Sequence, residues 1–211
     1  MLKVKFRLLR FLTLLLLLWL IMMAARMGVA DIKFTHADNQ LSYWIDSGNM
    51  SESSYSSAID ELSSSLRLTP NNPQYLEILA NVQSRAVYRG FSGRDNFARS
   101  LENYNKSLSL KPIWPWGWSA KAYTKWRLGE IDDELWQALL MLDRVGQYNV
   151  QAHLTIVDIG LMLISNNTVY RDKALDLTMK HYRRGMENRQ AIGLMNDIIE
   201  RYGVEDLVSQ W

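Results

Sequence analysis

Apolar residues recur at helical spacing in two stretches of the chain that lie 42 residues apart. In the first stretch, Tyr55 to Pro73, the apolar positions advance by three and four residues, as on one face of an amphipathic helix. The second stretch, Phe97 to Pro115, repeats the same spacing. The matched pairs are Tyr55 and Phe97, Ile59 and Leu101, Leu62 and Tyr104, Leu66 and Leu108, Leu68 and Leu110, Pro70 and Pro112, and Pro73 and Pro115. The pattern predicts two equivalent helices, with the third and fourth matched pairs in the core.

Two prolines close each of these stretches. The residue before a proline avoids helical dihedral angles, so the helices are expected to stop near Pro70 and Pro112. Pro73 and Pro115 can lie in the first turn of the following helix, where a missing N–H is harmless. Helix, Leu-x-Leu-x-Pro-x-x-Pro, helix is typical of tetratricopeptide-type repeats, whose usual period is about 34 residues. A glycine-containing loop between Tyr88 and Asn96 accounts for the longer period here.

Apolar periodicity predicts further helices in the C-terminal half of the chain. The expected helices span residues 118–128, 133–145, 151–164, 172–186 and 191–202. The first two form one pair, the next two form another, and the last helix ends at Gly203. No stretch shows sustained period-two alternation. We therefore expect an all-α chain whose residues 51–211 form antiparallel helix pairs of tetratricopeptide type.

The first thirty residues have a different pattern. Basic residues at positions 3, 5, 7 and 10 precede an apolar run from Phe11 to Ala25, as in a segment inserted with its N-terminus in the cytoplasm. The run is either a retained transmembrane anchor or a signal peptide, because Gly28-Val29-Ala30 has the small residues that a signal peptidase accepts. The stretch from Leu8 to Val29 matches the thickness of a bilayer core if Arg10 and Arg26 snorkel, which favours the anchor.

These patterns divide the chain into three segments. Residues 1–30 are expected to form a cytoplasmic basic tip and a transmembrane anchor, or a signal peptide. Residues 31–50 are expected to be a linker, and residues 51–211 a tetratricopeptide-like helical domain. The predicted fold class is therefore all-α, with an N-terminal transmembrane helix followed by helix pairs on the far side of the membrane.

Charge and cysteine content narrow the possible functions. The chain has 24 basic and 22 acidic residues, and five of the basic residues lie in the acid-free segment 1–30. The remaining residues therefore carry 19 basic and 22 acidic side chains. A nucleic-acid-binding domain should have a basic surface, so no nucleic-acid partner is expected. The chain has no cysteine, which excludes a disulfide framework and a thiolate metal site.

Residues suited to catalysis or metal binding are scattered. None of His36, His153 and His181 has a carboxylate or a second histidine three or four residues further on. The acids at positions 132–134 stand at a predicted helix start, where capping and the helix dipole explain them. Asp158 lies in an apolar stretch and must be paired if it is buried. Phosphate loops, nucleophile elbows and metalloprotease motifs are missing from the sequence. We therefore expect no enzyme, no cofactor and no metal site.

Three tryptophans are the first candidate for a partner or glycan surface. Trp114, Trp116 and Trp118 lie in the stretch Lys-Pro-Ile-Trp-Pro-Trp-Gly-Trp. Because Pro115 is expected to start a helix, Trp116 and Trp118 should be mostly buried in its first turn. Trp114 should be more exposed, on the loop before the helix. The alternative is that these indoles form a stacking platform for sugar rings.

Four arginines are the second candidate. They surround the loop between Tyr88 and Asn96, and they are Arg85, Arg89, Arg94 and Arg99. Forked guanidinium contacts would suit an anionic sugar or a lipid phosphate. The alternative is that these side chains lie on a solvated helix face and loop. Stacked helix pairs offer a further surface, because their concave side suits an extended segment of another protein.

Three stretches together resemble one protein family: LKPIWPWGW (110–118), KWRLGEIDDELWQAL (125–139) and VDIGL (157–161). They are similar to the VpsP-type polysaccharide-biosynthesis proteins of bacteria, over roughly residues 50–165. The resemblance implies a single-pass protein of the bacterial inner membrane with a periplasmic helical-repeat domain, encoded among exopolysaccharide and biofilm-matrix genes. It brings no catalytic residues, and residues 166–211 lie outside it.

The expected function follows from this resemblance and from the repeats. We expect a non-catalytic accessory or scaffold protein of exopolysaccharide biosynthesis or export. Its expected partner is a membrane protein of the same pathway, bound through the helical-repeat surface, and the polysaccharide is a second candidate ligand. The alternative is a membrane-tethered carbohydrate-binding module that stacks exposed tryptophans on sugar rings.

Overall fold

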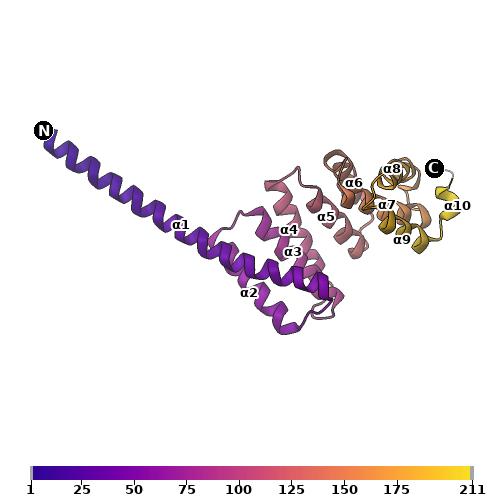
Figure 1. Ribbon diagram of the computed structural model, residues 1–211, viewed down its shortest axis with the longest axis horizontal. Helices are drawn as coiled ribbons and strands as arrows, with labels where there is room; N and C mark the ends of the chain where they lie inside the picture. The colour runs from indigo at the N-terminus through magenta and orange to yellow at the C-terminus, as the bar shows by residue number, and fades with distance from the viewer. Residues whose placement is uncertain (1, 210–211) are drawn as a thin grey trace. The chain divides into compact units, whose positions relative to one another are not determined.

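The computed structural model describes residues 2–209, with side chains from residue 9 onward. The described chain is all-helical, as predicted (Figure 1). It divides into two compact units, with the boundary between Val82 and Gln83 inside α3. The helices are α1 (Leu2–Ser47), α2 (Glu52–Leu68), α3 (Pro73–Tyr88), α4 (Asp95–Leu110), α5 (Pro115–Leu128), α6 (Asp133–Val145), α7 (Val150–Ser165), α8 (Arg171–Met186), α9 (Ile192–Tyr202) and α10 (Glu205–Val208).

Helix α1 continues through the segment for which the sequence suggested a linker. Residues 31–47 are helical, so the prediction of a linker over 31–50 is wrong for all but residues 48–50. One stripe of this part of α1 is apolar and buried, at Ala30, Phe34, Ala37, Leu41 and Trp44. The stripe packs against α2 and the first part of α3. Because its spacing of three and four residues gives one continuous apolar face, residues 30–47 act as the first helix of a repeat pair with α2.

Two hydrogen bonds join α1 to the end of α2. Arg26 Nε donates to Leu68 O at 2.8 Å, which satisfies a carbonyl left open at the helix terminus. Ser65 Oγ donates to Ala30 O at 2.9 Å in a buried position. The end of α2 therefore lies beside the residues of α1 where the exposed apolar segment gives way to the buried stripe.

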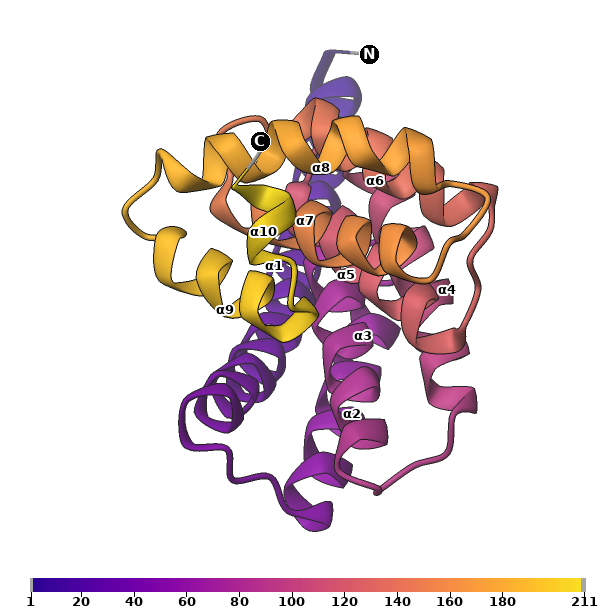
Figure 2. The same cartoon turned by 90° about the vertical axis from the view of Figure 1, so that its right-hand side faces the viewer.

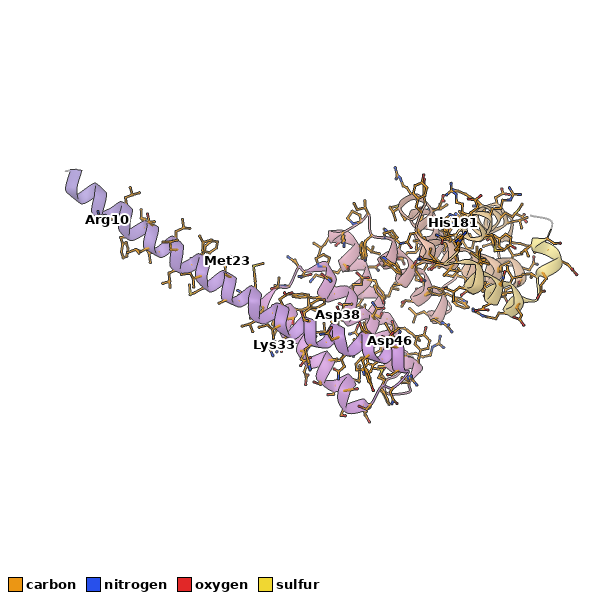
Figure 3. All side chains as sticks on the ribbon, in the orientation of Figure 1. Arg10, Met23, Lys33, Asp38, Asp46 and His181 are labelled. Carbon is orange, nitrogen blue, oxygen red and sulfur yellow. The ribbon has the colours of Figure 1, made fainter. Side chains whose placement is uncertain are left out.

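The N-terminal part of α1 is apolar and exposed on all sides. Every residue from position 9 to position 29 is exposed, and the helix is long and apolar enough to cross a membrane. Figure 3 shows Arg10 and Met23 on this part of α1, and Asp38 and Asp46 on the part that packs with α2. A signal sequence has a similar length and composition, so the fold of this helix fits both alternatives for residues 1–30.

The second unit is a stack of helix pairs. Helix α5 contacts α6, and α7 contacts α8, as the apolar periodicity predicted. The first helices of successive pairs also meet, since α7 contacts both α5 and α9. Figure 2 shows α7 with α8 and α9 on either side of it. This arrangement, in which each pair packs on the next, is that of tetratricopeptide-type repeats.

The two copies of the 42-residue pattern form α2 and α4, each within its own unit. Each helix ends two residues before the first proline of its copy, and the second proline begins the next helix, as predicted. Leu62, Tyr104 and Leu108 are buried as expected. Leu66 is only partly buried, at the edge of its core. The repeat in the sequence is therefore a repeat in the structure.

The remaining helix boundaries follow the sequence closely. Helix α6 spans the predicted residues, α7 is longer than predicted by one residue at each end, and α8 and α9 differ from their predicted ranges by one residue at the start only. Gly203 ends α9 in the left-handed conformation, with φ of 61°, which glycine adopts without steric cost. The short helix α10 was not predicted.

Helices α7 and α8 approach each other closely at Gly160. A Cβ atom at this position would lie 2.0 Å from Thr178 Oγ1. The Thr178 side chain is fully buried, and its hydroxyl donates to Ala174 O at 2.6 Å. Because a buried β-branched side chain has little rotamer freedom, Thr178 cannot easily move aside, and only glycine fits.

We predict that Gly160→Ala destabilises the second unit by about 1–3 kcal/mol, the usual cost of overpacking a core. Gly193→Ala is the matched control, because a Cβ atom at this position of α9 meets nothing within 4 Å. The control should stabilise the unit by about 0.5–1 kcal/mol through helix propensity. Denaturant unfolding followed by circular dichroism measures both changes. Equal effects of the two substitutions would contradict the close packing of α7 on α8.

Candidate functional site

The three tryptophans at the α4–α5 junction differ in exposure. Trp118 is partly buried, and its Nε1 donates to Pro112 O at 2.8 Å. Trp114 is also partly buried, and the Lys111 ammonium lies 3.3 Å from the centroid of its ring. Trp116 is 46% exposed. The prediction that Trp116 is mostly buried and that Trp114 is the more exposed of the two is therefore wrong.

The reason is the glycine between the tryptophans. Pro115 does begin α5, but the residue of the first turn that faces α4 is Gly117. A Cβ atom on Gly117 would lie 2.8 Å from Leu108 Cδ2. Trp116 precedes Gly117 by one residue, which is about 100° around the helix, and its side chain turns away from α4. Because α4 approaches so closely, only glycine fits at the buried position, which is Gly117.

Trp116 belongs to an exposed apolar group, the Trp116 patch, which consists of Leu110, Ile113 and Trp116. All three side chains are exposed, Ile113 to 76%. Large apolar side chains exposed together are typical of contact sites. The ring of Trp114 does not extend this patch freely, because Lys111 covers one of its faces. The junction therefore presents one open indole and two aliphatic side chains.

The four candidate arginines have separate contacts. Arg94 Nη2 donates to the last carbonyls of α5 at 3.2 and 3.4 Å, so it closes the end of that helix. Arg99 pairs with Asp95 of the same helix at 3.7 Å. Arg85 lies in the last turn of α3 and Arg89 directly follows the helix. Burial, and then the charge of Arg89, lower the pKa of Arg85. Arg94 and Arg99 therefore make structural contacts.

Three acids beside the start of α6 hold a buried lysine of α5. Lys125 donates to Glu130 at 2.7 Å and to Glu134 at 2.8 Å, and lies 3.0 Å from Asp132. Burial alone would lower the pKa of Lys125, but the three carboxylates raise it. Hydrogen bonds from Lys121 and Lys125 lower the pKa of Glu134 to about 2. Asp132 also caps α6 as expected, accepting a backbone N–H at 2.9 Å.

Asp158 connects the first helices of three successive pairs. Its buried carboxylate on α7 accepts hydrogen bonds from Tyr123 of α5 at 2.9 Å and from Tyr202 of α9 at 3.1 Å. Arg201 Nη1 of α9 lies 3.2 Å from the same carboxylate. Burial, and then the charge of Asp158, raise the pKa of both tyrosines, which therefore remain protonated donors. The expectation that a buried Asp158 must be paired is confirmed.

Two buried histidines form another network, which sequence spacing did not reveal. His153 Nδ1 of α7 lies 2.8 Å from His181 Nδ1 of α8, and His181 Nε2 lies 2.8 Å from Asp143 Oδ1 of α6. Burial lowers the pKa of His181 to about 4 and also lowers the pKa of His153. Hydrogen bonds from Lys180 and His181 lower the pKa of Asp143 despite its burial. Figure 3 marks His181 in the crowded region of α7 and α8.

No triad of histidine and acidic side chains is placed to hold a metal ion among the residues that the structure describes. The buried Asp158 and the partly buried Asp143 are instead bound to donors of neighbouring helices. These networks hold helix pairs together. Of the sequence candidates, Trp116, Arg89, Arg94 and Arg99 are exposed, and the others are partly buried.

No family model and no curated protein matches the chain. Two solved structures, titled "Crystal structure of MamA" and "Crystal structure of MamA protein", are similar to it in fold. The first has a TM-score of 0.54 and 15% sequence identity, and the alignment spans 78% of this chain and 87% of the MamA chain. The second has a TM-score of 0.52 and 15% sequence identity, and the alignment spans 78% of this chain and 92% of the other chain. The likeness supports a helical-repeat fold of tetratricopeptide type.

We predict that Asp158→Asn destabilises the second unit by about 1.5–3 kcal/mol, the range for hydrogen bonds to a charged group. Tyr123→Phe and Tyr202→Phe should each have a smaller effect, and the two should not be additive because they share one acceptor. Asp197→Asn on the exposed side of α9 is the control, with an expected change below about 0.5 kcal/mol. Thermal unfolding measures all four. If Asp158→Asn leaves the free energy of unfolding unchanged, the carboxylate does not stabilise the contacts among α5, α7 and α9.

Acid should destabilise the second unit through His181. A histidine of the unfolded chain titrates near pH 6.5, whereas His181 in the folded chain titrates at about 4. The stability from neutral His181 is therefore complete above about pH 6.5 and is lost as the pH falls towards 4, because the unfolded chain takes up the proton first.

The loss between about pH 7 and pH 5 should be roughly 2 kcal/mol, measured by urea unfolding at a series of pH values. His181→Gln should flatten this pH dependence. An equally steep acid loss in His181→Gln would refute the assignment.

Proposed function

We propose that this chain is a membrane-tethered, non-catalytic scaffold that binds a protein partner through its helical-repeat units. The observation that carries the proposal is the continuity of α1, which leads from an exposed apolar segment directly into the buried stripe of the first helix pair. Repeat arrays present extended surfaces that suit segments of other proteins, and the fold shared with MamA is of this kind.

The contacts of Arg26 and Ala30 support a retained tether. Ala30 is fully buried, and its carbonyl accepts the hydrogen bond of Ser65. Arg26 closes the end of α2. Cleavage after Ala30 would remove both contacts and the first residue of the buried stripe. A signal peptide has no need of such contacts, so we favour the anchor.

The basic residues before the apolar run support an N-terminus in the cytoplasm. We place the repeat units in the periplasm of a bacterium, with α1 crossing the inner membrane once. The pathway rests on the resemblance of residues 110–118, 125–139 and 157–161 to the VpsP-type proteins. On that basis the partner is a membrane protein of exopolysaccharide, or biofilm-matrix, biosynthesis or export, and the polysaccharide is the second candidate ligand.

The Trp116 patch is the best supported of the surfaces suggested by the sequence. Exposed tryptophans are common among the residues that dominate binding energy at protein interfaces, and Ile113 and Leu110 extend the apolar contact area. Sugar stacking is less well supported, because Lys111 covers one face of Trp114, and Trp116 is the one exposed indole of the three in this stretch. We therefore assign the patch to a protein partner.

Site-specific photo-crosslinking in native membranes tests this proposal. A photoreactive amino acid at position 116 of the full chain should crosslink to a membrane protein encoded with the polysaccharide machinery. The control places the same amino acid at position 169, because Val169 is 90% exposed in the turn before α8. No crosslink to the partner is expected there. Trp116→Ala should lower recovery of the partner by about tenfold or more and change stability by less than about 0.5 kcal/mol.

Three outcomes would contradict the proposal. Crosslinks of equal yield at positions 116 and 169 would show that the patch is not a contact site. Crosslinks to glycan alone would favour the carbohydrate-binding module. Full recovery of the partner with Trp116→Ala would show that the patch is not part of the interface.

A further inference from the structure

A cavity of about 470 Å³ lies between the start of α7 and the end of α8. Tyr148 and His153 line it from the α6–α7 turn and from α7, and Arg184, Glu187 and Arg189 line it from α8 and the turn that follows. The Trp116 patch includes none of these residues. The chemistry of the lining indicates a separate binding site.

The cavity is positively charged. Arg184 and Arg189 outnumber the one acidic lining residue, Glu187. Arg184 Nη1 is shielded from solvent and donates to no acceptor among the described residues. A buried N–H without an acceptor is unfavourable, and guanidinium groups bind carboxylates through paired, charge-assisted hydrogen bonds. A carboxylate in the cavity would therefore supply the missing acceptor.

The histidine network determines which nitrogen of His153 is available to the cavity. A carboxylate only accepts hydrogen bonds, so His181 Nε2 carries the proton that it donates to Asp143. Neutral His181 then has no proton on Nδ1, and His153 Nδ1 must be the donor in the 2.8 Å contact between the rings. His153 Nε2 is left unprotonated, and it is the atom that can take up a proton beside the cavity.

We propose that this cavity binds a carboxylate from an acidic segment of a partner protein, with Arg184 donating to the carboxylate and His153 Nε2 taking up a proton from solvent as the segment binds. The inference rests on the proposed scaffold function and adds the chemistry of the partner. The volume suits a side chain rather than a packed helix.

Tyr148 extends this site to a second hollow. Its side chain is 94% exposed at the rim of the cavity. Tyr148 also lines a neighbouring hollow of about 450 Å³, together with Arg144. A segment with acidic residues on both sides of an apolar residue would place one carboxylate in each hollow and the apolar side chain on the tyrosine ring. The two basic hollows around an exposed aromatic side chain therefore favour an extended acidic peptide.

Binding should depend on pH because of the charges around His153. These are Asp143 on α6, Lys180, His181 and Arg184 on α8, and Glu187 and Arg189 in the turn after it. Burial, and then Arg184, lower the pKa of His153, whereas Asp143 raises it. A bound carboxylate favours protonated His153 and raises its pKa. The segment should therefore bind more tightly as the pH falls from about 8 towards 6, with uptake of a proton.

A fluorescent hexaglutamate peptide titrated into the full chain in detergent tests the proposal. We expect saturable binding that tightens by about fivefold between pH 8 and pH 6.5, and no binding of hexaglutamine. Arg184→Gln should weaken binding by about tenfold or more. Lys173→Gln removes the same charge from an exposed site of α8 and should change the affinity by less than about twofold.

His153→Gln should retain binding at pH 8 but lose both the pH dependence and the proton uptake, which calorimetry in two buffers of different ionisation enthalpy measures. Tyr148→Ser, at an exposed turn position, provides a second variant that should fold, and it should weaken binding of a peptide with an apolar residue between its acids.

Equal affinity of Arg184→Gln and the unmodified chain would overturn the proposal. Binding of an oligoglucuronate through Arg184, without binding of hexaglutamate, would show that the carboxylate comes from a carbohydrate. If hexaglutamate does not bind but position 116 still crosslinks to the partner, this site alone is refuted. Failure of both experiments would refute the scaffold function as well.

Discussion

The first unit depends on one helix, α1, that is exposed in its N-terminal part and packed against α2 in its C-terminal part. Residues 9–29 of α1 are exposed on all sides, whereas from Ala30 onward one stripe of the same helix is buried. Because a helix keeps a fixed rise and rotation per residue, the burial of Ala30 determines where the apolar segment leaves the unit. Arg26 and Ser65 fasten the end of α2 to that point. The apolar segment is therefore continuous with the first helix of the repeat pair, and no flexible linker separates them.

The second unit is held by buried polar groups as well as by its apolar core. Asp158 joins α5, α7 and α9, Lys125 joins α5 to the acids beside α6, and His181 joins α6, α7 and α8. Lys125 is paired within one helix pair, whereas Asp158 and His181 are groups that a single pair could not bury without a partner from its neighbour. The pairs are therefore interdependent. The histidine network also reaches the surface at His153, which lines a basic cavity, so the interior and a candidate binding site share one set of hydrogen bonds.

Local patterns in the sequence were enough to predict the helices and most of their ends, because proline, glycine and apolar spacing act within a few residues. The buried stripe from Ala30 to Trp44 has the same apolar spacing, so the linker expected over residues 31–50 overlooked a signal of the same kind. Contacts between helices could not be predicted in this way. His153 and His181 are 28 residues apart and meet only in the folded chain. Gly117 displaces Trp116 from the interior because α4 approaches closely.

The mass of the chain extracted from membranes tests the central claim most directly, since a tether that is also the first repeat helix has to be retained. The account predicts that intact-mass spectrometry of the protein expressed in bacteria finds residues 1–30 still attached, in the membrane fraction, at about the 24.5 kDa of the full sequence. A folded chain that begins at residue 31, recovered from the soluble periplasmic fraction, would contradict it.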